Sequence, residues 1–232
     1  LLDLPQLAWF AFAGNPFSAT QPSIDSVPYI SSSSFTLQET LGQGASGVIS
    51  KAQWKKPHNT FPAEVAVKVF KGEVTSDGYP QDELAACLAI GKHPNLVQSL
   101  AQVNEKNYLA LIMQLIPSHY KNLGLPPSLE SCTRDTFSKN MRLSHTHAKK
   151  IIAQMQTLFE HLHSKKVCHG DLYAHNTLVD DNANIIFGDF GAASMYHMLS
   201  DCQQEKIRTI EARALQHFIN DMMSLCQTAH AE

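Results

Sequence analysis

Hydrophobic residues follow two different spacings along this chain, and the change falls near its middle. Between residues 35 and 115, apolar and polar positions tend to alternate, most clearly in Glu64–Phe70, where valine recurs at every second position. Alternation of this kind with β-branched residues predicts strands. A single helix is predicted near residues 80–91. The first half of the chain is therefore expected to be rich in strands.

In the second half, apolar residues recur at helical spacing. Ser144 fits a helix N-cap, and the stripe that follows it consists of Ile151, Ile152, Met155, Leu158, Phe159 and Leu162. Short strands are predicted at 177–179 and 185–187, and a final helix at about 207–227. A strand-rich half followed by a helix-rich half favours an α+β fold with two lobes and a cleft between them.

The first 34 residues differ from the rest. Leu4, Leu7, Phe10, Phe12 and Asn15 fit the template of a leucine-rich repeat, in which apolar residues fill a solenoid core. One repeat cannot bury its own apolar face, so residues 1–17 are predicted to be the last unit of a longer array. The alternative is a short amphipathic leader that packs on the next domain. Residues 18–34 have the Ser- and Pro-rich composition of a linker.

Composition excludes several classes of function. The net charge of −3 and the scattered basic pairs give no electrostatic footprint for nucleic acid or an anionic membrane. The five cysteines form no CxxC pair, so reduced thiols in the cytoplasm are expected. No run of about 20 apolar residues predicts a membrane span. The chain starts without methionine, and we expect it to be part of a longer polypeptide.

The first candidate for chemistry is a glycine-rich stretch, Leu41–Ile49, with glycines at 42, 44 and 47. Glycines at this spacing allow a hairpin backbone to approach phosphate groups and to direct N–H groups at them. The stretch lies between two predicted strands, unlike the strand-to-helix setting of a dinucleotide fold. A flexible hairpin without a ligand is the alternative.

A lysine in an apolar strand is the second candidate. Lys68 ends the sequence Val65-Ala66-Val67-Lys68, where it would be costly to bury without an anionic partner. Phosphate groups or a carboxylate would serve. Glu83, on the predicted helix before His93-Pro94-Asn95, is the carboxylate candidate. A lysine facing solvent from an edge strand, and a solvated helix acid, are the alternatives.

Two further motifs carry oxygen ligands. In His169–Asn176, an aspartate and an asparagine lie five positions apart, so Asp171 can orient an attacking hydroxyl while Asn176 coordinates magnesium. In Gly188-Asp189-Phe190-Gly191, Asp189 offers carboxylate oxygens, which Mg²⁺ prefers. Four motifs in this order make coincidence improbable.

Residues 35–227 together resemble a protein kinase, and the leucine-rich template before them resembles that of a leucine-rich-repeat Ser/Thr protein kinase. The resemblance implies a first lobe at 35–113, a hinge at 114–117 and a second lobe at 118–232 whose last helices are missing. It implies ATP and Mg²⁺ as cofactors, with Lys68, Glu83, Asp171 and Asn176 as catalytic residues and with Asn176 and Asp189 as metal ligands. The ATP contacts that it implies are Leu41, Gly42, Gly44, Gly47, Ile49, Ala66, Lys68, Met113, Gln114 and Ile116.

The sequence also departs from the family pattern. Gly170 replaces an arginine that reads a phosphorylated activation loop, and Tyr173 stands where Ser/Thr kinases place a lysine. No Ala-Pro-Glu triplet follows Gly191, and Glu211 occupies the usual place of an aspartate at the predicted start of a large helix. A reduced platform for peptide docking is therefore expected.

These departures leave three functions open. The principal prediction is a Ser/Thr protein kinase with a short activation segment, a protein substrate and a further protein partner at the missing repeats. A small-molecule kinase of the aminoglycoside or choline type is the first alternative, because His-Gly-Asp is common in that group. The second is a pseudokinase that binds nucleotide without transferring phosphate.

Overall fold

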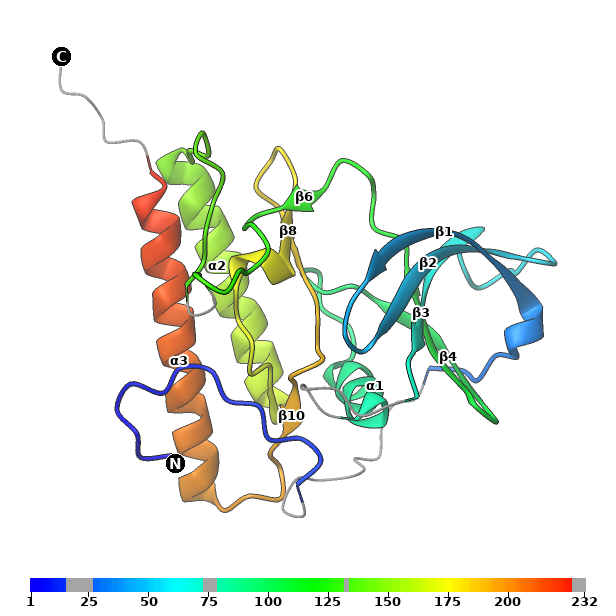
Figure 1. Cartoon of the computed structure of the whole chain (residues 1–232), viewed down its shortest axis with the longest axis horizontal. Coiled ribbons are helices and arrows are strands. Elements are labelled where there is room, and N and C mark those ends of the chain that lie inside the picture. The colour runs from blue at the N-terminus through cyan, green and yellow to red at the C-terminus, as the bar shows by residue number, and fades with distance from the viewer. Residues whose placement is uncertain (16–26, 73–78, 132–133, 227–232) are drawn as a thin grey trace.

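The computed structural model describes residues 1–15, 27–72, 79–131 and 134–226. It has a strand-rich lobe and a helical lobe side by side (Figure 1). The predicted α+β fold with two lobes is confirmed. In the described residues, no helix is long and apolar enough to cross a membrane.

The N-lobe is an antiparallel sheet of five strands in the order β1-β2-β3-β5-β4. The strands are β1 (Phe35–Gln43), β2 (Gly47–Trp54), β3 (Glu64–Phe70), β4 (Ser99–Glu105) and β5 (Tyr108–Gln114). Valines at alternate positions of β3 bury one face in a core with Phe35 and Trp54, as the alternating pattern predicts.

The other face of the sheet packs on helix α1 (Pro80–Ile90). Leu84 and Leu88 of α1 contact Phe70 and Leu111 in a separate apolar cluster. Proline at the first helical position is compatible with the helix start, because its missing N–H would have had no partner there. The helix therefore holds Glu83 against the strand that carries Lys68.

The described end of the predicted linker is in contact with the sheet. Residue 30 donates its backbone N–H to the Gln102 carbonyl over 2.8 Å, and Gln102 donates to the Pro28 carbonyl over 3.0 Å. A short 3-10 turn, η1 (Ser32–Ser34), leads into β1. Residues 18–26 lie outside the described residues, so the linker itself remains a prediction.

Two long helices form the C-lobe core. Helix α2 (His145–Ser164) begins at the predicted cap, where Ser144 Oγ accepts a hydrogen bond from the His147 backbone over 3.1 Å. Its apolar stripe packs against α3 (Asp201–Ser224) and the short strands below the cleft. These short elements are β6 (Lys121–Asn122), β7 (Val167–Cys168), η2 (Ala174–Asn176), β8 (Thr177–Val179), β9 (Ile185–Phe187) and β10 (Ser194–Met195).

Helix α3 starts earlier than predicted. It begins at Asp201, and Ser200 and Gln203 form a reciprocal capping box before it. The first turns of α3 are polar, so hydrophobic spacing does not reveal them, whereas the cap fixes the start. Glu211 consequently lies in the middle of the helix and not at its start, which corrects the sequence prediction.

The segment that follows α1 joins the two lobes. Asn95 donates its side-chain amide to Gln154 of α2 over 2.8 Å and to the Ile185 carbonyl over 3.0 Å. The Phe187 backbone N–H in turn donates to the Asn95 carbonyl over 2.8 Å. This link between lobes fixes α1 relative to β9, and therefore Glu83 relative to Asp189.

Candidate active site

The glycine-rich stretch forms the turn between β1 and β2. The Gly44 backbone donates to the Gly47 carbonyl over 3.0 Å, and the Lys71 ammonium donates to the Gly44 carbonyl over 2.8 Å. A side chain on Gly47 would place Cβ 2.5 Å from the Val69 carbonyl, whereas Cβ atoms on Gly42 and Gly44 would meet nothing within 4 Å. Glycine is therefore required at 47 by packing, and 42 and 44 leave the turn open above the cleft.

Lys68 and Glu83 form a buried ion pair. The Lys68 ammonium donates to Glu83 Oε1, and the two residues are 9% and 3% exposed. Burial of either charge alone would be costly, so the two side chains hold each other at the back of the cleft. Glu83 Oε2 is buried and has no hydrogen-bond partner in the described residues.

Residues assigned to the adenine pocket lie near this pair along the sheet. Ile49 pairs with Lys68 across β2 and β3, and Ala66 pairs with Met113 across β3 and β5. The Gln114 backbone N–H donates to the Gln98 carbonyl over 2.9 Å, so this N–H already has an acceptor. The register thus brings the predicted residues of β2, β3 and β5 together on adjoining strands.

The candidate catalytic loop, which carries Asp171, joins β7 to η2. Asn176 donates its side-chain amide to Asp171 Oδ2 and to the Asp171 carbonyl, both over 3.0 Å. The amide N–H groups of Asn176 are therefore directed at Asp171, and its carbonyl oxygen is left to accept or to ligate a cation. Both side chains are half-buried; Asp171 lies on the loop and Asn176 is the last residue of η2.

Asp189 lies on the loop between β9 and β10. Its side chain is exposed, and its backbone has a φ of 56°, a conformation that costs energy for a residue with a Cβ. Strain of this kind persists only where the surroundings impose it, and it is concentrated at functional sites. The Gly191 backbone donates to Asp189 Oδ1 over 3.4 Å.

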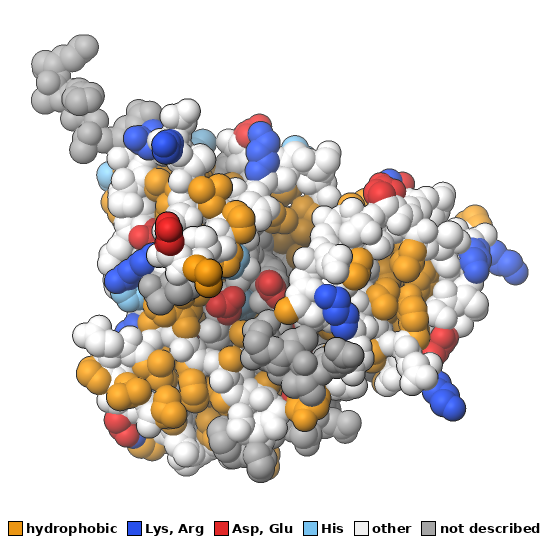
Figure 2. All heavy atoms as spheres, in the orientation of Figure 1, with side chains coloured by type: hydrophobic (Ala, Val, Ile, Leu, Met, Phe, Trp, Pro, Cys, Tyr) orange, Lys and Arg blue, Asp and Glu red, His pale blue; other side chains and the backbone are white. Residues whose placement is uncertain are grey.

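Two titratable neighbours, Cys87 and His175, are influenced by these charged side chains. Burial and, after it, the Glu83 carboxylate raise the pKa of the Cys87 thiol in α1. Lys68 lowers this pKa, and Asp189 raises it. Burial likewise lowers the pKa of His175, while Asp171 and Asp189 both act in the opposite direction. Lys68, Glu83 and Asp189 thus act on one neighbour, and Asp171 and Asp189 act on the other. Figure 2 shows a hollow between the lobes, with acidic side chains beside it.

The donor set fits a hard cation held jointly with phosphate. The Asn176 carbonyl oxygen and the Asp189 carboxylate are the kinds of ligand that Mg²⁺ prefers. Among the described residues, no group of three or more His, Cys, Asp or Glu side chains is placed to hold a metal ion alone. Oxygen atoms of a nucleotide would have to complete the coordination.

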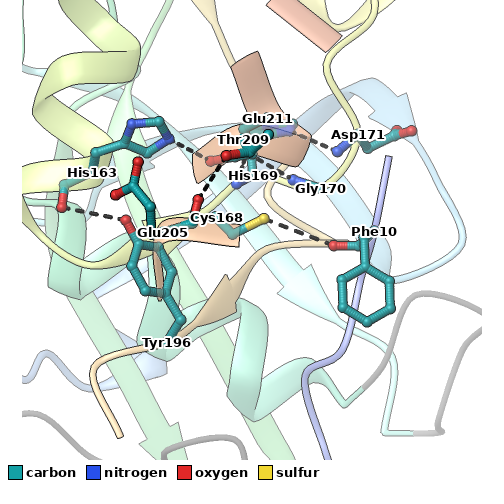
Figure 3. A network of polar contacts seen from close by, with 10 residues as sticks. All are labelled: Phe10, His163, Cys168, His169, Gly170, Asp171, Tyr196, Glu205, Thr209 and Glu211. Atoms are coloured by element: carbon teal, nitrogen blue, oxygen red, sulfur yellow. Dashed lines mark hydrogen bonds and ion pairs between the residues drawn. The ribbon is translucent and has the colours of Figure 1, made fainter. Parts of the chain in front are cut away.

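Glu211 supports the loop that carries Asp171. The sequence places this acid on the final helix but does not indicate its partners. Glu211 Oε1 accepts backbone hydrogen bonds from His169 over 2.7 Å and Gly170 over 3.3 Å (Figure 3). Its Oε2 lies 2.9 Å from His163 Nε2. The sequence does contain an indication of this role. An acid on the apolar face of a helix, next to Ile207 and Ile210, must have a buried partner.

Asp135 is a second supporting acid, and the sequence gave no sign of it. Both of its carboxylate oxygens accept from the Ala174 backbone, over 2.8 and 2.9 Å. Burial raises the pKa of Asp135 to about 6 although this hydrogen bond opposes the shift. No local pattern identifies such a contact, because residues 135 and 174 are far apart in the chain.

The short segment after Asp189 is anchored along its length. Strand β10 pairs with β7, and the Tyr196 backbone donates to the Lys166 carbonyl over 2.9 Å. His169 links the two loops, since its Nε2 lies 3.1 Å from the Gly188 carbonyl and its ring packs on Phe187 and Phe190. The segment is short, and it reaches α3 at Asp201, earlier than the sequence predicts.

Comparison with known proteins identifies this arrangement. Residues 35–214, well over half of the chain, match the family model described as the protein kinase domain. The chain belongs to the protein kinase family. Family membership supports ATP binding and phosphotransferase activity.

A curated relative of this kinase is the "Fatty acyl-CoA synthetase and RNA processing-associated kinase 1" of Saccharomyces cerevisiae. The two are 26% identical over 171 residues, which is 68% of this chain and 18% of the yeast protein. The chain thus spans less than a fifth of that relative's length, and the similarity concerns the kinase domain.

Proposed function

We propose that this protein kinase transfers the γ-phosphoryl group of ATP to the hydroxyl of a serine or threonine in a protein. The observation that carries the proposal is the buried Lys68–Glu83 pair. A lysine fixed in this way can hold the α- and β-phosphates without having to be ordered when ATP binds. The hydrogen bonds of Asn95 to Ile185 and Phe187 tie the segment after α1 to β9, the strand that leads to Asp189.

The remaining roles follow from the positions of the side chains. Gly42 and Gly44 leave the turn above the cleft open for phosphates, and Ile49, Ala66 and Met113 line the place for the adenine. Asp171 accepts the proton of the attacking hydroxyl. Asn176 and Asp189 would hold Mg²⁺, which neutralises charge on the phosphate oxygens when bound.

Catalysis in this proposal depends on positioning and on charge. The phosphoryl group needs little covalent help, so the protein contributes a fixed lysine, fixed oxygen ligands and a correctly placed base. Asn176 donates to Asp171 Oδ2 and so fixes the orientation of this carboxylate.

The direct test is incubation with γ-labelled ATP and magnesium, offered to the protein itself, to a generic protein substrate and to a panel of small alcohols. We expect label on serine or threonine, and we expect it to disappear in Asp189→Ala. Label on a small alcohol alone would favour the small-molecule kinase, a function supported by the short segment between Asp189 and α3. Nucleotide binding without transfer to any acceptor would favour the pseudokinase.

A further inference from the structure

Residues Leu4–Phe12, here called the N-terminal strap, lie against the C-lobe and cross α3 (the dark blue trace in Figure 1). Arg213 of α3 donates to the Leu4 carbonyl over 3.1 Å and to the Leu7 carbonyl over 3.0 Å. Ala8 and Phe12 are each 3% exposed. The strap is therefore anchored by hydrogen bonds at one end and by buried side chains beyond it.

Trp9 joins the strap to the residues that directly follow Asp171. Its indole N–H donates to the Leu172 carbonyl over 2.9 Å. Its ring stacks on Tyr173, with centroids 4.9 Å apart and planes 4° apart, and lies 5.3 Å from the His217 ring of α3. Trp9 thus fills the space between the catalytic loop and α3.

Phe10 lies against the residues that directly precede Asp171. A Cβ on Gly170 would lie 3.0 Å from the Phe10 carbonyl oxygen and 2.8 Å from the Ala192 carbonyl oxygen. The Cys168 thiol also points at the Phe10 carbonyl, over 3.7 Å (Figure 3). With a φ of 78° as well, position 170 admits glycine and excludes the arginine of the family pattern.

We propose that Trp9 and Phe10 are positioning residues, which fix the catalytic loop around Asp171 from outside the kinase lobes. The inference rests on the proposed function and extends it to the control of catalysis. The strap stands in for the link between an arginine and a phosphorylated activation loop, which Gly170 removes. A displacement of a catalytic group by about 1 Å can cost up to 100-fold in rate, so contacts on both sides of Asp171 would have a measurable kinetic effect.

The kinetic test compares Trp9→Ala, Trp9→Phe and Asp3→Asn in the full chain. Trp9→Ala should lower kcat by about 10- to 100-fold and leave KM for ATP within about twofold, since Trp9 contacts the residues after Asp171 and His217 of α3. Trp9→Phe keeps the stacked ring and should recover most of kcat. Asp3→Asn removes an exposed ion pair with Lys206 near the start of the strap and should change neither constant.

A second measurement reports the docking of the strap without requiring activity. The chain contains two tryptophans, so Trp54→Phe leaves Trp9 as the single indole. Acrylamide should quench its fluorescence less in the folded protein than in the urea-unfolded chain, and Gly170→Ala should increase the quenching by displacing the strap. An indole that is quenched equally in both states would overturn the proposal.

Combination of the two measurements separates the possible failures. A protected indole together with an unchanged kcat in Trp9→Ala would reduce the strap to a structural element and overturn its role in positioning. A parallel loss of kcat in Asp3→Asn would do the same, since the effect would then be one of general stability. A protected indole in a parent chain that transfers no phosphate would contradict the proposed function itself, and the kinetic role with it.

Discussion

The proposed nucleotide side of the cleft (the glycine turn, Lys68 and Glu83) and the proposed acceptor side (the loop around Asp171 and the segment before α3) differ in how closely they follow the protein kinase pattern. On the nucleotide side, the glycine turn, Lys68 and Glu83 stand where the pattern expects them, and the ion pair is formed. On the acceptor side, Gly170 and Tyr173 replace basic residues, and the segment before α3 is short. On the nucleotide side, a buried lysine needs a buried acidic partner, so few substitutions of Lys68 or Glu83 can be tolerated. On this second side, the N-terminal strap and Glu211 instead contact the loop that carries Asp171.

The largest expected effect lies on the acceptor side, at Asp171. In Asp171→Asn, the acceptor hydroxyl loses its proton acceptor, and we expect a loss of about 4–5 kcal/mol of transition-state stabilisation, or 1000-fold or more in kcat. Nucleotide affinity, measured by titration calorimetry, should be nearly unchanged. An equal loss of affinity and turnover would place Asp171 among the nucleotide contacts instead.

On the nucleotide side, Lys68→Met should destabilise the fold by about 3–4 kcal/mol, because it leaves the Glu83 carboxylate buried without its partner. The double variant Lys68→Met, Glu83→Leu should regain most of that stability in urea unfolding and yet transfer no phosphate. If the double variant were no more stable than the single one, the pair would not be the reason for the cost.

Glu211 offers a third test, again on the acceptor side. Glu211→Leu leaves the backbone N–H groups of His169 and Gly170 without an acceptor, and we expect a loss of about 2–3 kcal/mol in the free energy of unfolding. Glu211→Gln keeps an acceptor oxygen and should lose less. Equal urea midpoints for Glu211→Leu and the parent chain would mean that the loop does not depend on this acid.

Two glycines of the same turn form a matched pair on the nucleotide side. Gly47→Ala should cost about 2 kcal/mol, since its Cβ would overlap the Val69 carbonyl, which is part of the sheet. Gly44→Ala should change stability by about 0.5 kcal/mol or less. Thermal unfolding of both variants decides the matter, and similar losses would argue against packing as the reason for Gly47.

The smallest expected effect is the pH dependence contributed by Asp135 on the acceptor side. Because burial raises its pKa from 3.8 to about 6, the folded protein binds this proton more tightly than the unfolded chain does. The resulting stability is fully present below about pH 4 and is lost as pH rises through about 6, by about 1 kcal/mol after allowance for solvent screening. Asp135→Asn should flatten this part of the stability profile. An unchanged profile in the variant would assign the slope to another group.

Much of the fold was predictable because the signals are local. The alternation in Glu64–Phe70 and the stripe in α2 each report the face that an element buries, and both elements form as predicted. The start of α3 was missed because its first turns are polar. The Lys68–Glu83 contact was predictable from the free-energy cost of burying an unpaired charge, since a lysine in an apolar strand needs an anionic partner.

The rest of the site could not be read from the sequence, because it depends on contacts between distant segments. Nothing local in Trp9 or Asp135 indicates Leu172 or Ala174 as a partner. In the sequence, Gly170 is notable only because the family pattern has an arginine at this position. Its reason, the Phe10 carbonyl beside it, becomes apparent when the chain is folded.

The anchoring of the short segment before α3 also bears on covalent control. Ser194 and Tyr196, which lie in this segment, are 1% and 0% exposed. Another enzyme cannot reach a hydroxyl that is buried to this extent unless the β7–β10 pairing first opens. Modification of either residue would therefore have to occur on a partly unfolded chain, during synthesis or after local opening, and a folded molecule would be closed to it.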